Sequence, residues 1–337
     1  MKVVPFAIFG AFESGIIYAI MALGVYLSFR VLDFPDLTVD GSFVTGAAVA
    51  AILIFNGYNP FLATIIAFIA GFLAGCVTGL LHTKGKINPL LSGILMMIAL
   101  YSINIRIMGK SNVALLNQES GLDIVSGWWD SLGLNAPFNA LFNMVGWGEF
   151  LPQTWGIFFF MIVVTFFIKW LTDRFLKTEV GLAIRATGNN KKMIRSFSAN
   201  TDLFIILGLG LSNALVAFSG ALIAQLTSFA DVGMGIGMII IGLASVIIGE
   251  ALFGTKSIAR TTLAVIGGAI VYRIVVTLAL RADFLKTSDM KLITASIVII
   301  ALVLPKIIDN QKARQLKKKK NAERMATVQM ASAGKDE

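Results

Sequence analysis

Charged side chains are scarce in this chain of 337 residues. Only 14% of the residues are Asp, Glu, Lys or Arg, whereas 57% are hydrophobic and the mean hydropathy is +0.82. Soluble domains usually contain about 25% charged and about 45–50% apolar residues. The composition therefore excludes an ordinary soluble domain and indicates a protein embedded in lipid.

The residue types on which metal sites and many enzymes depend are also nearly missing. His82 is the single histidine and Cys76 the single cysteine, so neither a zinc-ligand cluster nor an intramolecular disulfide is expected. The triplet Gly-Lys-Ser at 109–111 resembles the end of a phosphate-binding loop, but Asn104 stands where that motif requires its first glycine. Because no set of nucleophile and base stands out, we expect no catalysis and no cofactor in this chain.

Long apolar runs are what the sequence contains instead. A helix needs about 20 mainly apolar residues to cross a hydrocarbon core about 30 Å thick. Nine runs reach or approach this length: 12–30, 41–56, 60–81, 89–109, 155–171, 203–226, 238–253, 261–281 and 291–306. The sequence thus predicts an all-α polytopic membrane protein with about nine spans. No small-residue cleavage site follows the first run, so we interpret it as a retained span.

The distribution of basic residues predicts the orientation in the membrane. The gap from Lys169 to Asp202 holds seven basic and three acidic residues, whereas the gap from Lys110 to Pro152 holds one basic and four acidic residues. Short cytoplasmic loops are enriched in Lys and Arg. We therefore expect the first gap inside and the second outside, with the N-terminus outside and the C-terminus cytoplasmic. This topology explains the net charge of +9 without nucleic acid.

Two polar breaks interrupt the apolar runs at comparable places. Residues 33–42 contain three aspartates and Pro35, which disfavours a helix before it, and residues 231–237 are rich in glycine. Because four predicted spans lie on each side of a fifth, equivalent spans would run in opposite directions. We therefore expect broken helices near 33–42 and 231–237 and an inverted repeat. The first break is either a capped cytoplasmic loop or a turn lining a solute pathway.

The basic gap contains a further candidate element. Residues 179–187 predict a short helix ended by Gly188, after which Asn189 or Asn190 caps a second helix through Phe197. Apolar residues among positive charges suit docking on a soluble partner, although a solvated basic loop fits the same pattern.

A row of glycines is present in the third predicted span. Gly71, Gly75 and Gly79 stand at four-residue intervals and so lie on one helix face. We expect that face to approach another helix closely.

Three stretches resemble one family of transport proteins. They are residues 32–42 (Leu-Asp-Phe-Pro-Asp-Leu-Thr-Val-Asp-Gly-Ser), residues 181–190 (Gly-Leu-Ala-Ile-Arg-Ala-Thr-Gly-Asn-Asn) and the run from Gly235 to Gly249. Over about residues 10–306 the chain is similar to permeases of ATP-binding cassette (ABC) importers for branched-chain amino acids and ribose. Residues 91–95 and 102–109 narrow the resemblance to a subgroup described as tryptophan or tyrosine importers.

The resemblance implies a permease subunit of a binding-protein-dependent importer for a small solute, by its subgroup an aromatic amino acid. The implied partners are a cytoplasmic ABC ATPase dimer that binds ATP and Mg²⁺, an external solute-binding protein and a second permease subunit, in a homodimer or alternatively a heterodimer. The implied location is the bacterial plasma membrane. Residues 1–308 would form the transmembrane domain, with an external loop at 110–154 and a coupling loop at 172–202. Residues 309–337 would be a basic, disordered cytoplasmic tail.

The resemblance also assigns residues to two sites. The ATPase-coupling residues would be Glu179, Gly181, Leu182, Arg185, Ala186, Gly188 and Asn189. The break beside the pathway contributes Phe34, Asp36, Thr38, Asp40 and Ser42. Independently of the resemblance, the scarcity of charge within the spans predicts a pathway lined by small polar groups, for which Asn104, Ser212, Asn213 and Ser245 are further candidates. Polar side chains also bond to backbone or to neighbouring membrane helices, which is the alternative for each of the last four.

An ion-coupled secondary transporter or channel is the second class of function that the sequence allows. It would need its own carboxylates or a selectivity filter near the midplane. The spans between residues 41 and 104 contain no Asp or Glu, which disfavours proton coupling.

Overall fold

The computed structural model describes residues 4–144, 154–196 and 199–279, together with residues 292, 295, 296, 299 and 303. Within these residues, eight helices are long and apolar enough to cross a membrane, which confirms an all-α polytopic architecture. The predicted ninth span at 291–306 lies largely outside the described residues.

The eight membrane-length helices form two groups along the chain. The first group is α1 (Val4–Tyr26), continued by the π-helix η1 (Leu27–Val31), then α2 (Thr38–Phe55), α3 (Pro60–Thr83) and α4 (Pro89–Met108). The second group is α7 (Trp155–Phe175), α10 (Thr201–Thr227), α11 (Met238–Phe253) and α12 (Ile258–Ala279). Asn59 and Asn88 cap α3 and α4, each followed by a proline at the first helical position, which fits the free N–H groups there.

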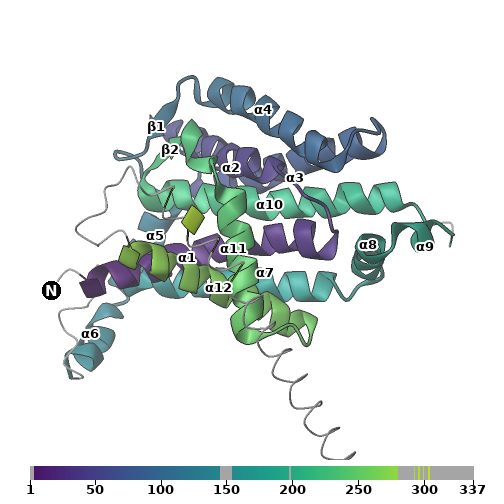
Figure 1. The fold of residues 1–337 in the computed structure, drawn as a ribbon. Coiled ribbons are helices and arrows are strands. Elements are labelled where there is room, and N and C mark those ends of the chain that lie inside the picture. Colours follow the sequence, from purple (N-terminus) through teal and green to yellow (C-terminus); the bar gives the residue numbers. More distant parts are fainter. Residues whose placement is uncertain are drawn as a thin grey trace, which may run out of the picture.

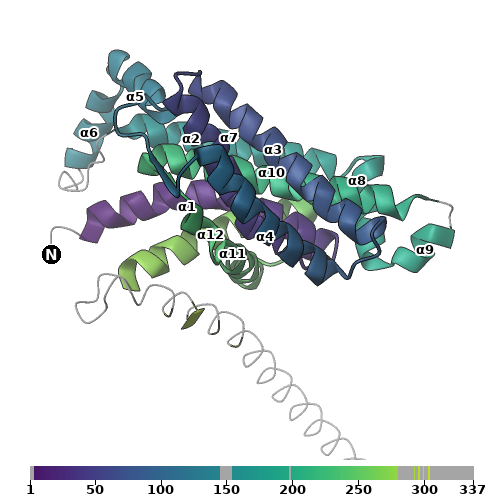
Figure 2. The same cartoon turned by 90° about the horizontal axis from the view of Figure 1, so that it is seen from above.

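Shorter elements lie between these helices. They are β1 (Asn112–Ala114), α5 (Gly121–Ser131), α6 (Asn135–Met144), α8 (Glu179–Asn189), α9 (Lys191–Ser196), β2 (Phe229–Asp231) and the 3₁₀ helix η3 (Val232–Gly235). Strands β1 and β2 pair antiparallel with Val113 opposite Ala230. This pairing brings together the segments that follow α4 and α10. Both views place α5 and α6 at one end of the molecule and α8 and α9 at the other (Figure 1, Figure 2).

Helices α1 and α10 form the centre of the molecule. Helix α10 packs against α1, α2 and α3, and α1 packs in addition against α7, α11 and α12 (Figure 1). Hydroxyl groups bond across these contacts: Ser219 donates to the carbonyl of Ile17 at 2.9 Å and Thr165 to that of Ile16 at 3.2 Å. Such bonds hold helices together where no water competes.

The glycine row of α3 lies close to another helix, as its spacing predicts, and the structure shows that this helix is α10 of the same chain. A methyl group at Gly71 or Gly75 would overlap a backbone carbonyl of α10, that of Asn213 or that of Leu209. Helix α3 therefore lies against the backbone of α10 without intervening side chains, which is the use of small residues in membrane helix packing.

The predicted breaks and short helices need small corrections. The helix resumes at Thr38, so the first break covers only 32–37 and not 33–42. Helix α8 extends to Asn189, two residues past the predicted range of 179–187. Asn190 caps the next helix by accepting from the N–H of Met193 at 3.0 Å.

Candidate functional site

The first break turns the chain back into the molecule after η1. Asp33 adopts a left-handed φ of 52°, and the N–H of Phe34 donates to the carbonyl of Ser28 at 2.9 Å. The ring of Phe34 lies edge-on against His82 at the end of α3, with 5.3 Å between ring centroids. The turn therefore places the residues after Phe34 between α3 and α10.

Asp36 is the centre of a fully buried polar network at this turn. Its carboxylate accepts from the backbone N–H of Thr38 at 2.9 Å and from the side-chain amide of Asn213 at 2.6 Å. Asn213 also donates to the carbonyl of Leu209, and the hydroxyls of Thr38 and Thr78 lie 2.8 Å apart. These bonds are the compensation that a buried carboxylate requires. They tie the start of α2 to α3 and to the middle of α10.

Asp40 joins the first break to the second. Its two carboxylate oxygens accept from the backbone N–H groups of Gly237 at 2.9 Å and Ile239 at 2.8 Å. These N–H groups belong to the start of α11, where they have no partner within the helix and where the helix dipole favours a negative charge. The two polar breaks that the sequence singles out therefore meet at one point.

A cavity of about 380 Å³ opens beside this junction. It is lined by residues of α2, α4 and the segment before α11: Asp40, Gly41, Val44, Met97, Ile98, Tyr101, Asn104, Val232, Gly235 and Ile236. The amide of Asn104 donates to the carbonyl of Gly41 at 3.1 Å, while its buried Oδ1 has no hydrogen-bond partner within the described part of the chain. The walls are otherwise mainly apolar, which suits contact with an apolar or aromatic side chain better than retention of an ion.

The predicted pathway residues thus fall into two groups. Asp40 and Asn104 line the cavity, whereas Phe34, Asp36, Thr38, Ser42, Ser212, Asn213 and Ser245 are buried within the subunit. Ser212 donates to the carbonyl of Gly24 at 2.7 Å and Ser245 to that of Ile241 at 2.8 Å. These two hydroxyls bond backbone, as the alternative interpretation of the sequence allowed. A pathway role for the buried group stays a prediction.

One face of helix α8 is fixed to the transmembrane core. Thr178 caps the helix through the N–H of Gly181 at 3.2 Å. Ile184 is almost fully buried and lies with Leu32 around Gly208, and a methyl group at Gly188 would overlap the carbonyl of Val31. The chain therefore allows only a hydrogen at Gly188.

The other face of α8 is open. Of the predicted coupling residues, Gly181 is buried and Ala186 and Gly188 are half-buried, whereas Glu179, Leu182, Arg185 and Asn189 are exposed. In α9, Arg195 pairs with Asp202 at 3.2 Å. Burial, and then the charge of Arg195, lower the pKa of Lys191, against the opposing effect of Asp202. The α8–α9 segment thus presents apolar and cationic groups together.

An ion pair beside α8 was not found by sequence reasoning. The guanidinium of Arg30 in η1 donates to both carboxylate oxygens of Glu250 in α11. Arg185 of α8 lines the same cavity of about 680 Å³, as does Lys256. Arg30 and Glu250 are separated by 220 positions. The only signal of this pair in the sequence is the presence of a carboxylate near the end of a predicted span.

Comparison with known proteins identifies the family. A family model described as "Branched-chain amino acid transport system / permease component" matches residues 7–303. The chain belongs to this family of permeases. A tyrosine transport system permease protein of Clostridioides difficile is 43% identical over 296 residues, which cover 88% of this chain and 90% of that relative.

Two further relatives show the spread of the family. An uncharacterised protein of Rickettsia prowazekii is 34% identical over 243 residues, which cover 72% of this chain and 76% of that protein. A fructose import permease protein of Bifidobacterium longum is 26% identical over 270 residues, which cover 79% of this chain and 69% of that protein. The permease family is therefore shared by relatives named for different solutes, and membership defines a transport permease without defining its solute.

Proposed function

We propose that this chain is the membrane-spanning permease subunit of an ABC-type importer for an amino acid. A second copy of the chain completes the pathway, an external binding protein delivers the solute, and a separate cytoplasmic ATPase dimer binds ATP and Mg²⁺. The relative from Clostridioides difficile that is named for tyrosine transport favours an aromatic amino acid as the solute.

The two-faced geometry of α8 is the observation that carries this proposal. Its inner face, with Ile184 and Gly188, is packed without space against the chain at Val31 and Leu32. Its outer face leaves Leu182 half-exposed beside Arg185. An exposed leucine among cations suits binding to a soluble partner, and a rigid inner face transmits the partner's movement.

A continuous set of contacts leads from α8 to the cavity. Movement of Gly188 displaces Leu32, which begins the turn that holds Asp36 on Asn213. Asp36 also bonds the N–H of Thr38 at the start of α2, and Asp40 two residues later holds the start of α11. In this proposal the ATPase closes, α8 shifts, and both interrupted helices change position together at the cavity.

In this proposal the second copy of the chain packs against the rim of the cavity beside Asp40. Ile98, Tyr101 and Ile236 are each more than half exposed along its rim. We assign these side chains to a subunit interface because they border the cavity that Asp40 and Asn104 line. A second permease that covers this rim would enclose the cavity, and an apolar wall with few charges would release an amino acid that the binding protein has already selected.

Transport in proteoliposomes tests the proposal. The chain is reconstituted with its ATPase and binding protein, and uptake of labelled tyrosine is measured with and without ATP. We expect uptake only when all three proteins and ATP are present. Leu182→Asp should lower ATPase co-purification and uptake at least about tenfold, because a charged group replaces a central apolar contact. The control is Leu116→Asp, the same substitution at a leucine that is also exposed and lies at the opposite end of the molecule. Uptake by the permease alone under an ion gradient would refute the assignment in favour of a secondary transporter.

A further inference from the structure

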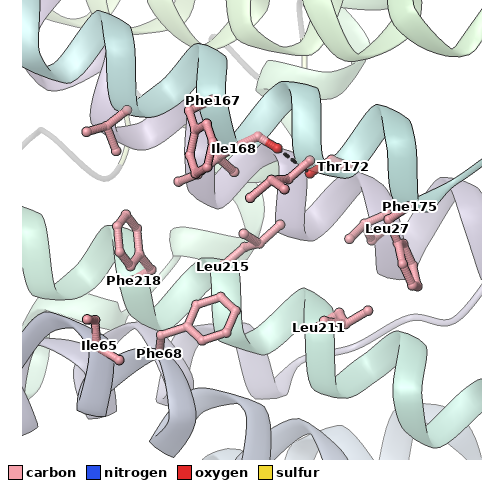
Figure 3. Close-up of a pocket in the computed structure, with 12 residues that line it drawn as sticks. Leu27, Ile65, Phe68, Phe167, Ile168, Thr172, Phe175, Leu211, Leu215 and Phe218 are labelled. Carbon is pink, nitrogen blue, oxygen red and sulfur yellow. Dashed lines mark hydrogen bonds between the residues drawn. The ribbon is translucent and has the colours of Figure 1, made fainter.

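A long apolar groove runs between α3 and α7, with α10 as its floor (Figure 3). It has a volume of about 560 Å³, and its walls include Phe68 of α3, Phe167 and Leu171 of α7, and Leu211, Leu215 and Phe218 of α10. The groove exists because α7 packs mainly against α1, α5 and α12 and therefore stands clear of α3. This groove is separate from the cavity beside Asp40.

The groove offers no polar group to a ligand. Thr172 carries the only hydroxyl among its lining residues, and that hydroxyl donates to the carbonyl of Ile168 at 2.9 Å (Figure 3). A polar ligand would lose its hydrogen bonds to water here and gain none, at a considerable cost in free energy. The occupant must therefore be a hydrocarbon.

The length of the groove matches one leaflet of a bilayer. Its lining along α7 runs from Val164 to Phe175, a rise of about 16 Å at about 1.5 Å per residue. Half of a hydrocarbon core is about 15 Å thick. The groove ends at Phe175, the last residue of α7, so it follows the leaflet on the side of α8. A single acyl chain of that leaflet has this length.

The end of the groove that adjoins α8 carries unpaired cations. Arg174 and Lys177 are both exposed there, and neither forms an ion pair within the part of the chain that the structure describes. The adjacent residue Asp173 already binds the Lys169 ammonium at 2.5 Å and the hydroxyl of Thr262 at 2.6 Å. The Arg174 guanidinium lies over the ring of Trp170, a residue type that favours the membrane interface.

We propose that this groove and its two cations form a binding site for a phospholipid with an anionic head group. One acyl chain occupies the groove, and the head group lies on Arg174 and Lys177. Charge complementarity selects an anionic lipid over a zwitterionic one. Charge also favours a lipid over a second copy of the chain. A second copy would bring its own Arg174 and Lys177 into the interface, and the core of an interface excludes charge.

Native mass spectrometry of the purified full-length protein tests the site. The protein is released from nanodiscs that contain equal amounts of phosphatidylglycerol and phosphatidylcholine, and the retained lipid is identified. We expect phosphatidylglycerol to be retained preferentially. Arg174→Gln and Lys177→Gln should each weaken its retention about fivefold. Lys86→Gln, which removes an exposed cation after α3, should leave retention unchanged.

A second pair of variants tests the groove itself. Leu171→Trp places a larger side chain in the groove and should displace the acyl chain, whereas Val163→Trp changes an exposed residue of the same helix outside the groove and should not. Both positions face away from the core, so folding should survive in each case. Equal retention of the two lipids, or full retention in Leu171→Trp, overturns the proposal. A disulfide-linked dimer of Phe167→Cys formed in high yield would assign the groove to a second copy and overturn it as well.

Discussion

The carboxylate of Asp40 accepts a hydrogen bond from the backbone N–H of Gly237, 197 positions further along the chain, at 2.9 Å. The bond joins the beginnings of two membrane helices, α2 and α11, each of which follows an interrupted segment. A helix start inside a membrane protein leaves N–H groups that lipid cannot satisfy. One carboxylate therefore stabilises the second interruption from within the first.

Substitution of Asp40 should reveal this dependence. Asp40→Ala removes both acceptors of the α11 start and should lower the free energy of unfolding by about 2–3 kcal/mol, since hydrogen bonds to charged groups contribute about that much. We expect a lower unfolding temperature in detergent and loss of transport. Asp40→Asn keeps one acceptor oxygen, so its stability should lie between that of the unsubstituted protein and that of Asp40→Ala. Asp33→Asn neutralises an exposed aspartate of the same segment and should have little effect; an equal loss in this control would mean that segment charge matters and the bond does not.

The network around Asp36 predicts an asymmetry between two neighbouring variants. Asn213→Leu leaves one oxygen of a fully buried carboxylate without its donor, which should cost about 3 kcal/mol or more. Ser212→Ala removes one neutral hydrogen bond, to Gly24, and should cost about 0.6 kcal/mol. Thermal unfolding of both variants in the same detergent measures the difference. Similar stability of the two would show that Asp36 does not depend on Asn213.

Close packing of α3 on α10 gives a steric prediction. In Gly75→Ala the added methyl group would overlap the carbonyl of Leu209, so the two helices must separate and lose contacts along their length. We expect a lower unfolding temperature and reduced expression. Gly10→Ala is the control, because a methyl group there meets nothing within 4 Å and alanine favours the helix. A Gly75→Ala protein as stable as the unsubstituted protein would mean that α3 and α10 do not lie in backbone contact at Gly75.

Apolar length was enough to predict the membrane-length helices. The run 60–81 corresponds to α3 and the run 203–226 to α10, each within two residues at either end. The break before α2 was predicted too long because Asp40, although charged, lies in the first turn of α2, where a helix start tolerates a carboxylate. The pairing of β1 with β2 was missed, since strands of three residues carry no periodic signal.

The candidate site was predicted in its parts and missed in its connections. Sequence reasoning identified the two breaks and the short helix at 179–187 from local composition. The bond from Asp40 to Gly237 and the pair of Arg30 with Glu250 join residues about 200 positions apart, and the packing of the whole chain decides them. A single sequence has no local feature that records such a partner. For the same reason, the sequence could not show that Asn104 lines the cavity whereas Ser245 is buried in the interior.

The orientation in the membrane gives the last prediction. Lys192 belongs to the basic α8–α9 segment, and Leu116 belongs to the acidic gap from Lys110 to Pro152, just before α5. Helices α8 and α9 lie at one end of the molecule and α5 at the other (Figure 1). Since basic segments are retained in the cytoplasm, Leu116 should face outward and Lys192 inward. Cys76 is the only cysteine, so Cys76→Ala gives a background in which single cysteines are introduced at these two positions.

An impermeant maleimide should label Leu116→Cys in intact cells and Lys192→Cys only after the plasma membrane is opened. Val163→Cys, within α7, should stay unlabelled in both conditions, which controls for leakage and for unfolding. Labelling of Lys192→Cys in intact cells would reverse the topology, and α8 could then not meet a cytoplasmic ATPase.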